Sequence, residues 1–125
     1  MRAVLIAVAI AGGLSLPSPA AAIPKTGADI LTYCPRSADE PSKDKLIGWF
    51  DCISFANGFV EGLKLAGQKP GKPVACFPEN VSVLQLLVIA NKFVGDHPEL
   101  MHRRASDLMA ISWVAAFPCA PTKRQ

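Results

Sequence analysis

The four cysteines are the residues of this chain with the most distinctive chemistry: Cys34, Cys52, Cys76 and Cys119. Zinc usually requires closely spaced pairs such as C-x-x-C, and the sequence contains no such pair. An even number of cysteines in an exported chain favours disulfides instead. We therefore expect two disulfides, no metal site, and no free thiol that could act as a nucleophile.

The histidines and carboxylates indicate no catalytic site. His97 and His102 are five residues apart, which places them off the i, i+4 face that a helical metal site uses. His97 is most simply a capping or surface residue, and His102 a surface residue. Asp51 and Glu61 are ten residues apart and match no acid–base pair. The chain also contains no G-x-S-x-G, Walker, H-E-x-x-H or dinucleotide motif, so we expect neither an enzyme nor a bound cofactor.

The first 22 residues have the composition of a secretory signal. Arg2 supplies a positive charge, an apolar run follows to Leu16, and residues 20–22 (A-A-A) precede a cleavage site. The run is shorter than the roughly 20 residues of a membrane span. We expect a mature domain over residues 23–125 with no membrane segment. The whole chain has 125 residues and a net charge of +3, which is too mild for an electrostatic nucleic-acid binder.

Hydrophobic spacing and capping signals predict an all-α fold, a small bundle of about four helices. The expected helices cover residues 27–34, 43–66, 83–95 and 98–117. Ser42 and Ser82 are the expected N-caps of the second and third helices, and Pro98 takes the first position of the fourth. The third helix is apolar nearly all round, which is typical of a buried helix. We expect Trp49 and Trp113 in the core.

The second predicted helix carries an apolar stripe and three glycines. The stripe, which steps by three and four residues, consists of Leu46, Phe50, Ile53, Ala56, Val60 and Leu63. Gly48, Gly58 and Gly62 lie inside the helix, and each costs up to about 1 kcal/mol relative to Ala. Gly58 and Gly62 share one face. They indicate either a weakened helix or the close approach of a neighbouring helix.

The order of the helices predicts which cysteines pair. A short connection makes the third and fourth helices antiparallel, so the start of the third lies near the end of the fourth. Cys76 precedes that start, and Cys119 follows that end. Cys34 ends the first helix, and Cys52 lies in the early turns of the second. We therefore expect two antiparallel hairpins, each closed by a disulfide, 34–52 and 76–119.

Four segments form a set that is more specific than any one of them alone. They are C-I-S-F-A-N-G-F-V-E (52–61), C-F-P-E-N-V-S-V-L-Q (76–85), D-H-P-E-L-M-H-R-R-A (96–105) and A-F-P-C (116–119). As a set they resemble the Rap/Tai family of type VI secretion amidase immunity proteins, over most of the mature chain. The chain departs from the family pattern at Ala56 and at Trp113 and Val114, which are packing positions.

The resemblance implies a small periplasmic helical protein, often a homodimer, that binds and blocks a peptidoglycan amidase delivered by type VI secretion. The partner is then a protein, a secreted cell-wall amidase. The shared segments are mostly cysteines, caps and core, which make the scaffold and do not define a toxin-binding surface. The alternative function is a periplasmic helical binding module or an acid-stress chaperone-like module. A neighbouring effector-like gene would favour immunity, and a lone gene induced by acid would favour the alternative.

The turn between the third and fourth helices is the expected partner-binding site. An inhibitor that enters an enzyme cleft needs a protruding, stiff loop, since a pre-organised loop loses less entropy on binding. The candidate residues are Asp96, His97, Pro98, Glu99 and His102. The same residues could merely cap two helices. The competing loop is Gln68 to Lys72, where Lys69 and Lys72 could meet an acidic partner.

Overall fold

The computed structural model describes residues 23–67 and 74–120. The elements are α1 (Gly27–Tyr33), η1 (Lys43–Lys45), α2 (Leu46–Gly67), α3 (Val83–Asp96), η2 (Pro98–Leu100) and α4 (Ala105–Ala116), where η denotes a 3-10 turn. This confirms an all-α fold of four helices for the described ranges. The predicted signal at 1–22 and the competing loop at 68–72 lie outside them.

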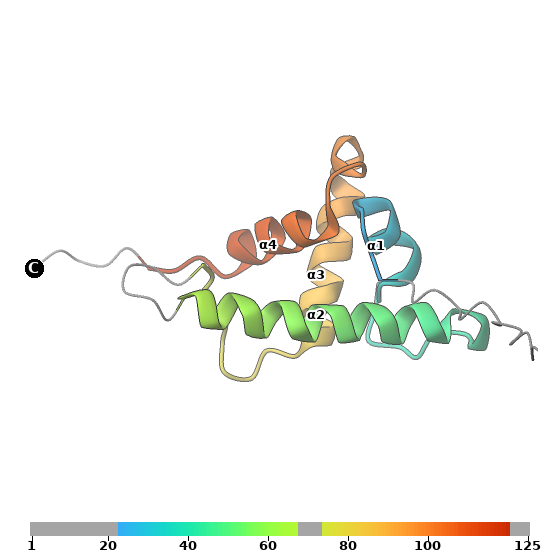
Figure 1. The fold of residues 1–125 in the computed structure, drawn as a ribbon, viewed down its shortest axis with the longest axis horizontal. Coiled ribbons are helices and arrows are strands. Elements are labelled where there is room, and N and C mark those ends of the chain that lie inside the picture. The colour runs from blue at the N-terminus through green and yellow to red at the C-terminus, as the bar shows by residue number, and fades with distance from the viewer. Residues whose placement is uncertain (1–22, 68–73, 121–125) are drawn as a thin grey trace, which may run out of the picture.

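Helix α3 is the centre of the arrangement. Figure 1 shows α2 crossing in front of α3, with α1 and α4 at its two sides, and α3 contacts each of the other three helices. Its buried residues are Leu86, Leu87, Ala90, Asn91 and Val94. The predicted cap is confirmed, because the Ser82 hydroxyl accepts a hydrogen bond from the Gln85 N–H at 3.1 Å. The sequence therefore correctly predicted a capped and buried third helix.

Two buried polar side chains of the core are fully bonded. The Trp113 indole N–H donates to the Leu86 carbonyl at 2.8 Å, which confirms Trp113 as a core residue. The Asn91 amide donates to the carbonyls of Ile30 and Cys34 at 3.1 and 3.2 Å. Both carbonyls lie at the C-terminal end of α1. The Ile30 oxygen also accepts from the Cys34 N–H at 3.0 Å, whereas the helix ends before it could supply an N–H to the Cys34 oxygen. Asn91 therefore caps α1 from α3.

Helix α1 starts at a capping box. The Thr26 N–H and hydroxyl both donate to an Asp29 carboxylate oxygen, at 2.9 and 3.1 Å. Burial alone would raise the pKa of Asp29, but hydrogen bonds from the N–H groups of Thr26 and Lys25 bring this pKa below its ordinary value. The ionised carboxylate is therefore favoured at the start of this short helix.

Helix α2 packs only one side against the core. Cys52, Ala56 and Val60 are buried, but Leu46 and Phe50 of the predicted stripe are 39% and 54% exposed. The stripe prediction was wrong at these two residues, because the helix reaches beyond the other helices at its N-terminal end (Figure 1). Ser42 also precedes η1, and α2 itself begins at Leu46.

The glycines of α2 do not accommodate another helix within the described chain. No atom lies within 4 Å of a Cβ placed on Gly58 or on Gly62. The helix nevertheless continues unbroken to Gly67. The close approach that the sequence offered as one interpretation is therefore not made by any described segment.

The fourth helix begins later than predicted. Pro98 opens only the 3-10 turn η2, and α4 begins at Ala105 with Arg104 as an extended N-cap. Residues 97–104 form the connection, which is longer than the sequence indicated. The cause is a long-range pairing with the start of α1, which diverts the backbone from a helical path.

Gly27 makes this pairing possible. Its N–H donates to the Arg103 carbonyl at 3.0 Å, and the next N–H, of Ala28, donates to the Met101 carbonyl at 3.1 Å. A Cβ on Gly27 would lie 2.7 Å from Leu108 Cδ1 and 3.0 Å from Met101 Cα. Any side chain at this position would push the two segments apart.

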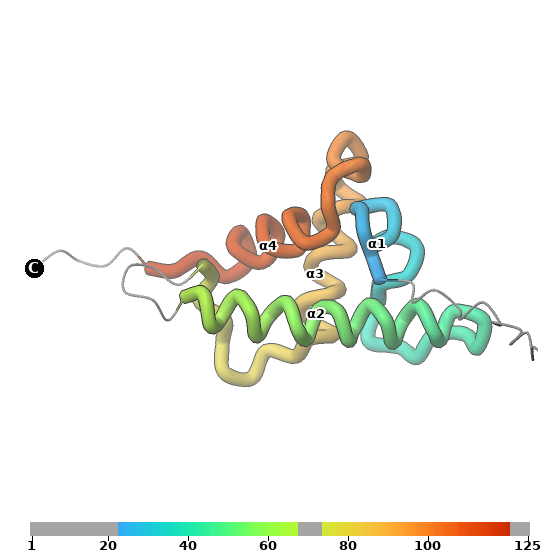
Figure 2. Tube along the Cα trace, viewed as in Figure 1, coloured from blue at the N-terminus to red at the C-terminus, as the bar shows by residue number. Residues whose placement is uncertain are grey.

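Both predicted disulfides are present. Cys34 joins Cys52 with a Cα–Cα distance of 5.3 Å, and Cys76 joins Cys119 with one of 5.0 Å. The first is buried in the core. The second lies at the surface, where the Cys76 N–H also donates to the Phe117 carbonyl at 3.0 Å. Figure 2 shows residues 74–82 passing the C-terminal end of α2 on the way to α3.

Candidate functional site

The turn formed by residues 97–104 projects beyond α3 and α1 (Figure 1). Three backbone hydrogen bonds shape it: Leu100 N–H to His97 O, Met101 N–H to Pro98 O, and Arg103 N–H to Leu100 O, at 2.9, 3.3 and 2.9 Å. The hydrogen bonds from the Gly27 and Ala28 N–H groups of α1 hold the C-terminal part of the turn. The turn is therefore a defined structure that does not depend on a partner for its shape.

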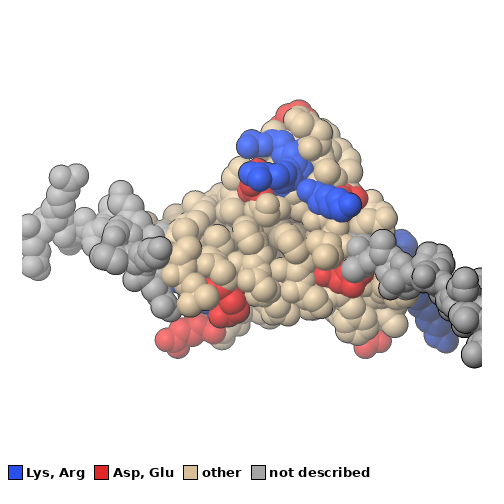
Figure 3. All heavy atoms as spheres, in the orientation of Figure 1, with Lys and Arg blue, Asp and Glu red and all other residues tan. Residues whose placement is uncertain are grey.

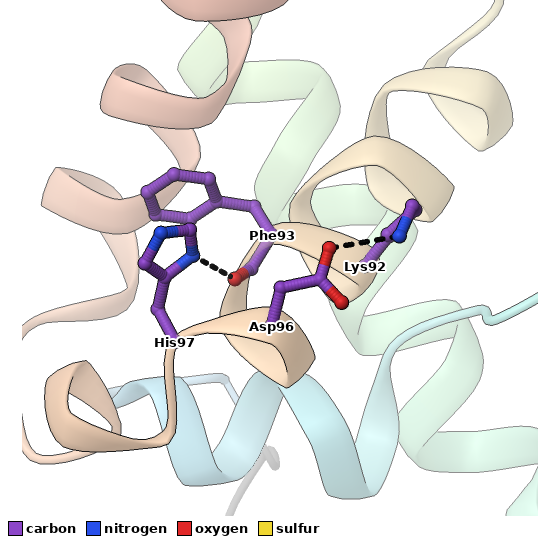
Figure 4. A network of polar contacts seen from close by, with 4 residues as sticks. All are labelled: Lys92, Phe93, Asp96 and His97. Carbon is purple, nitrogen blue, oxygen red and sulfur yellow. Dashed lines mark hydrogen bonds and ion pairs between the residues drawn. The ribbon is translucent and has the colours of Figure 1, made fainter.

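Asp96 and His97 lie at the C-terminal end of α3, where the turn begins (Figure 4). The Lys92 ammonium donates to an Asp96 carboxylate oxygen at 2.8 Å, and this hydrogen bond, together with the charge of Lys92, lowers the pKa of Asp96. His97 is the C-cap of α3, and its Nδ1 lies 2.8 Å from the Phe93 carbonyl oxygen. Because that oxygen can only accept, Nδ1 carries the proton. The imidazole also stacks on the Phe93 ring with centroids 4.4 Å apart.

Glu99 and His102 have a different role from the other predicted site residues. Both are exposed, and within the described chain their side chains make no hydrogen bond or ion pair. Pro98 is also exposed and occupies the first position of η2. The structure therefore brings four of the five predicted residues to the turn and places Asp96 at the end of α3 just before it. His97 and Pro98 shape the start of the turn, and Glu99 and His102 face solvent.

In residues 23–67 and 74–120, no three His, Cys, Asp or Glu side chains gather as a metal site. No helix of these ranges has the length and apolar character to cross a membrane.

A groove of about 660 Å³ that the sequence did not predict lies beside the C-terminal end of α1. Tyr33 and Trp49 contribute aromatic surface to it, and Arg36 and Lys45 contribute positive charge. The Arg36 guanidinium donates to the Leu31 carbonyl at 2.8 Å. Trp49 was expected in the core but is only half-buried, because α2 extends past the other helices here.

Three cations gather at the C-terminal part of the turn: Lys25 and the turn residues Arg103 and Arg104. The Ala105 N–H donates to the Lys25 carbonyl at 2.9 Å, and the backbones of Thr26 and Arg104 form an isolated antiparallel β-bridge. Figure 3 shows Lys and Arg side chains gathered on the upper part of this face. The sequence signals only the adjacent pair at 103–104, because Lys25 is distant in the chain and comes there by the long-range pairing.

Comparison with known proteins identifies a family. A search of curated proteins and a search of solved structures each gave no match. The model of a family described as Rap1a immunity proteins matches residues 26–119. The match starts at the N-cap of α1 and ends at the second cysteine of the outer disulfide, so it includes all four helices and both disulfides. The chain belongs to the Rap1a immunity protein family.

Proposed function

We propose that this protein protects its cell by binding and blocking a peptidoglycan amidase that is delivered by type VI secretion. Membership of the family gives the coarser statement: this is an immunity protein, and its partner is a protein effector. The amidase is our extension, from the resemblance of segments 52–61, 76–85 and 96–105 to Rap/Tai proteins. The observation that most supports it is the rigid, projecting turn that exposes Glu99 and His102.

We place the protein in the periplasm. The immunity proteins of this family are typically periplasmic, and peptidoglycan lies in that compartment. Two disulfides and no free cysteine in the described ranges suit an oxidising environment. The signal predicted at residues 1–22 would deliver the chain there and be removed after Ala22.

The turn could block a catalytic cleft without changing shape. Its backbone bonds fix the loop before binding, so little conformational entropy is lost in the complex. The Glu99 carboxylate can accept hydrogen bonds from donors in a cleft, and the His102 ring can both donate and accept. His97 would act indirectly by keeping the turn in place.

The direct test of the function uses an amidase effector encoded beside this gene. The purified protein should bind it and suppress its hydrolysis of isolated peptidoglycan. Production of the protein in the periplasm should protect cells that also export the amidase. Failure to bind such an amidase and to protect cells from it would reject the amidase assignment.

The binding site is tested by Glu99→Ala combined with His102→Ala. This variant should bind the amidase at least about tenfold more weakly in calorimetric titration, with an unchanged melting temperature. His97 is left intact because its ring supports the turn. Glu79→Ala with Asn80→Ala is the matched control, since both residues are exposed at a turn before α3. Full affinity of the Glu99/His102 variant would remove the turn as the site and favour Lys69 and Lys72.

We further propose that a second copy of the chain covers the outer face of α2. Ile47 and Leu65 are 73% and 65% exposed, and the helical repeat places them opposite the buried Ala56. Gly58 lies between them on that face, with open space around it. Sedimentation should find a homodimer, and Gly58→Arg should yield a folded monomer. A monomeric wild type would reject this arrangement.

A further inference from the structure

The charges beside the turn are incompletely neutralised. The Arg104 Nε donates to an Asp107 carboxylate oxygen at 3.1 Å, but the Arg104 side chain remains 80% exposed. The Asp29 carboxylate accepts hydrogen bonds from the backbone N–H groups of Lys25 and Thr26. Burial raises the pKa of Asp29, and these hydrogen bonds together with the charge of Lys25 lower it, so Asp29 offsets part of the Lys25 charge. Within residues 23–67 and 74–120, the Lys25 ammonium and the Arg103 guanidinium have no ion pair.

The backbone holds these cations in fixed positions. The Thr26–Arg104 bridge is flanked by hydrogen bonds from Gly27 N–H to Arg103 O and from Ala105 N–H to Lys25 O. Lys25 directly precedes Thr26, and Arg103 directly precedes Arg104, so both cations flank the β-bridge. The close approach at Gly27 keeps the two segments in contact. The relative placement of the charges is thus set by the fold.

We propose that Lys25, Arg103 and Arg104, here called the basic patch, are an electrostatic docking surface for an acidic region of the effector. The inference rests on the proposed function. It further states that the effector surface facing the patch must be acidic. Lys and Arg side chains gather on the upper part of the face shown in Figure 3, with a few Asp and Glu side chains among them and further Asp and Glu along the lower edge. Such a surface orients an approaching partner as well as attracting it.

A protein partner suits the basic patch better than a nucleic acid or a membrane. The net charge of the whole chain is only +3, and the cations form one small cluster beside the turn. A partner that receives the turn in its cleft would bring the rim of that cleft over the patch. Exposed charges at the edge of an interface mainly raise the association rate and make it salt-dependent. The basic patch therefore governs the association rate, and Glu99 and His102 of the turn govern the dissociation rate.

The test measures association with the amidase by stopped-flow fluorescence at 50 and at 300 mM NaCl, between which the Debye length falls from about 14 Å to about 6 Å. Lys25→Glu with Arg103→Glu should slow association about tenfold at low salt and only about twofold at high salt. The dissociation rate should change less than about threefold. Arg104 is left in place because it is the N-cap of α4 and pairs with Asp107.

The matched control is Lys43→Glu with Lys45→Glu, which changes the net charge equally at exposed residues of η1. It should keep the association rate within about twofold of wild type. An equal decrease of the association rate in both variants would overturn the docking role of the basic patch and leave the proposed immunity function intact. No binding of the amidase by the wild type would overturn both proposals. The Lys25/Arg103 variant could instead lose binding to phosphatidylglycerol vesicles and keep its association rate with the amidase. This result would assign the patch to a lipid surface and overturn the proposal of effector docking.

Discussion

The two ends of α3 are secured by different means. At the N-terminal end, the Cys76–Cys119 disulfide links the segment before α3 covalently to the segment after α4. At the C-terminal end, no described disulfide holds the turn, and its position depends on the pairing at Gly27 and on the ring of His97. The N-terminal end combines this covalent link with the hydrogen bond from the Cys76 N–H to the Phe117 carbonyl. The turn end, which is our proposed binding site, depends on the placement of individual atoms.

Removing the outer disulfide should have the largest effect on stability. For Cys76→Ala with Cys119→Ala, the chain-entropy model gives a loss of about 4 kcal/mol, within a typical range of about 2–5 kcal/mol. The bond spans 43 residues, so it restricts much of the unfolded chain. Urea unfolding of the variant and the wild type measures the loss.

The same variant also tests whether the two ends of α3 are coupled. Below its unfolding midpoint, it should bind the amidase with unchanged affinity, because the turn lies at the other end of α3. An unaltered urea midpoint would mean that the disulfide contributes no stability. Weakened binding by the folded variant would mean that the two ends are coupled.

Asn91→Leu should have the next largest effect. It removes the donor to the Cys34 carbonyl and one of two donors to the Ile30 carbonyl, which keeps its hydrogen bond from the Cys34 N–H. A buried acceptor without a partner costs about 1–3 kcal/mol, and we expect a loss of about 2 kcal/mol in urea unfolding. Asn57→Leu, at an exposed position of α2, should change stability by less than about 0.5 kcal/mol. Similar losses in the two variants would contradict the capping role.

Gly27→Ala tests the close approach at the turn end. Its new methyl group would meet Leu108 and the backbone of Met101, and overpacking of this kind costs about 1–3 kcal/mol. Gly62→Ala has open space and should stabilise the protein by up to about 1 kcal/mol. The two substitutions are chemically identical and differ only in their surroundings. We therefore expect the melting temperature to fall for Gly27→Ala and to rise for Gly62→Ala in thermal unfolding. A stabilising Gly27→Ala would show that the segments can separate without loss.

The smallest expected effect is the pH dependence at Asp29. Its pKa is below the ordinary 3.8 in the folded protein, so its stabilising effect is present above that value and is lost as pH falls through the folded pKa. Asp29→Asn should cost about 0.5–1 kcal/mol at pH 6, with a smaller difference from wild type at pH 2.5. Urea midpoints at both pH values measure this. An equal difference at the two pH values would exclude a charge effect.

The elements with local signals were predictable. The Ser82 cap, the buried pattern of α3 and the cysteine pairing all follow from residues that are close in sequence or from the order of the helices. The start of α4 was not predictable, because Pro98 is a good first residue and only the distant pairing with Gly27 prevents the helix. The same pairing brings Lys25 to Arg103. The exposure of Phe50 likewise depends on where the neighbouring helices end, which the periodicity of α2 does not encode.

The pairing of residues 25–28 with residues 101–105 also has a consequence for the order of folding. It closes a loop that includes most of the domain, and contacts this distant in sequence form slowly because the loop-closure entropy must be overcome first. During synthesis, the start of α1 emerges early and must wait for its partner, which lies beyond α3. We therefore expect the turn to take its final shape late in folding. Amide hydrogen exchange at Gly27, Ala28 and Ala105 would report how often this last step reverses in the native protein.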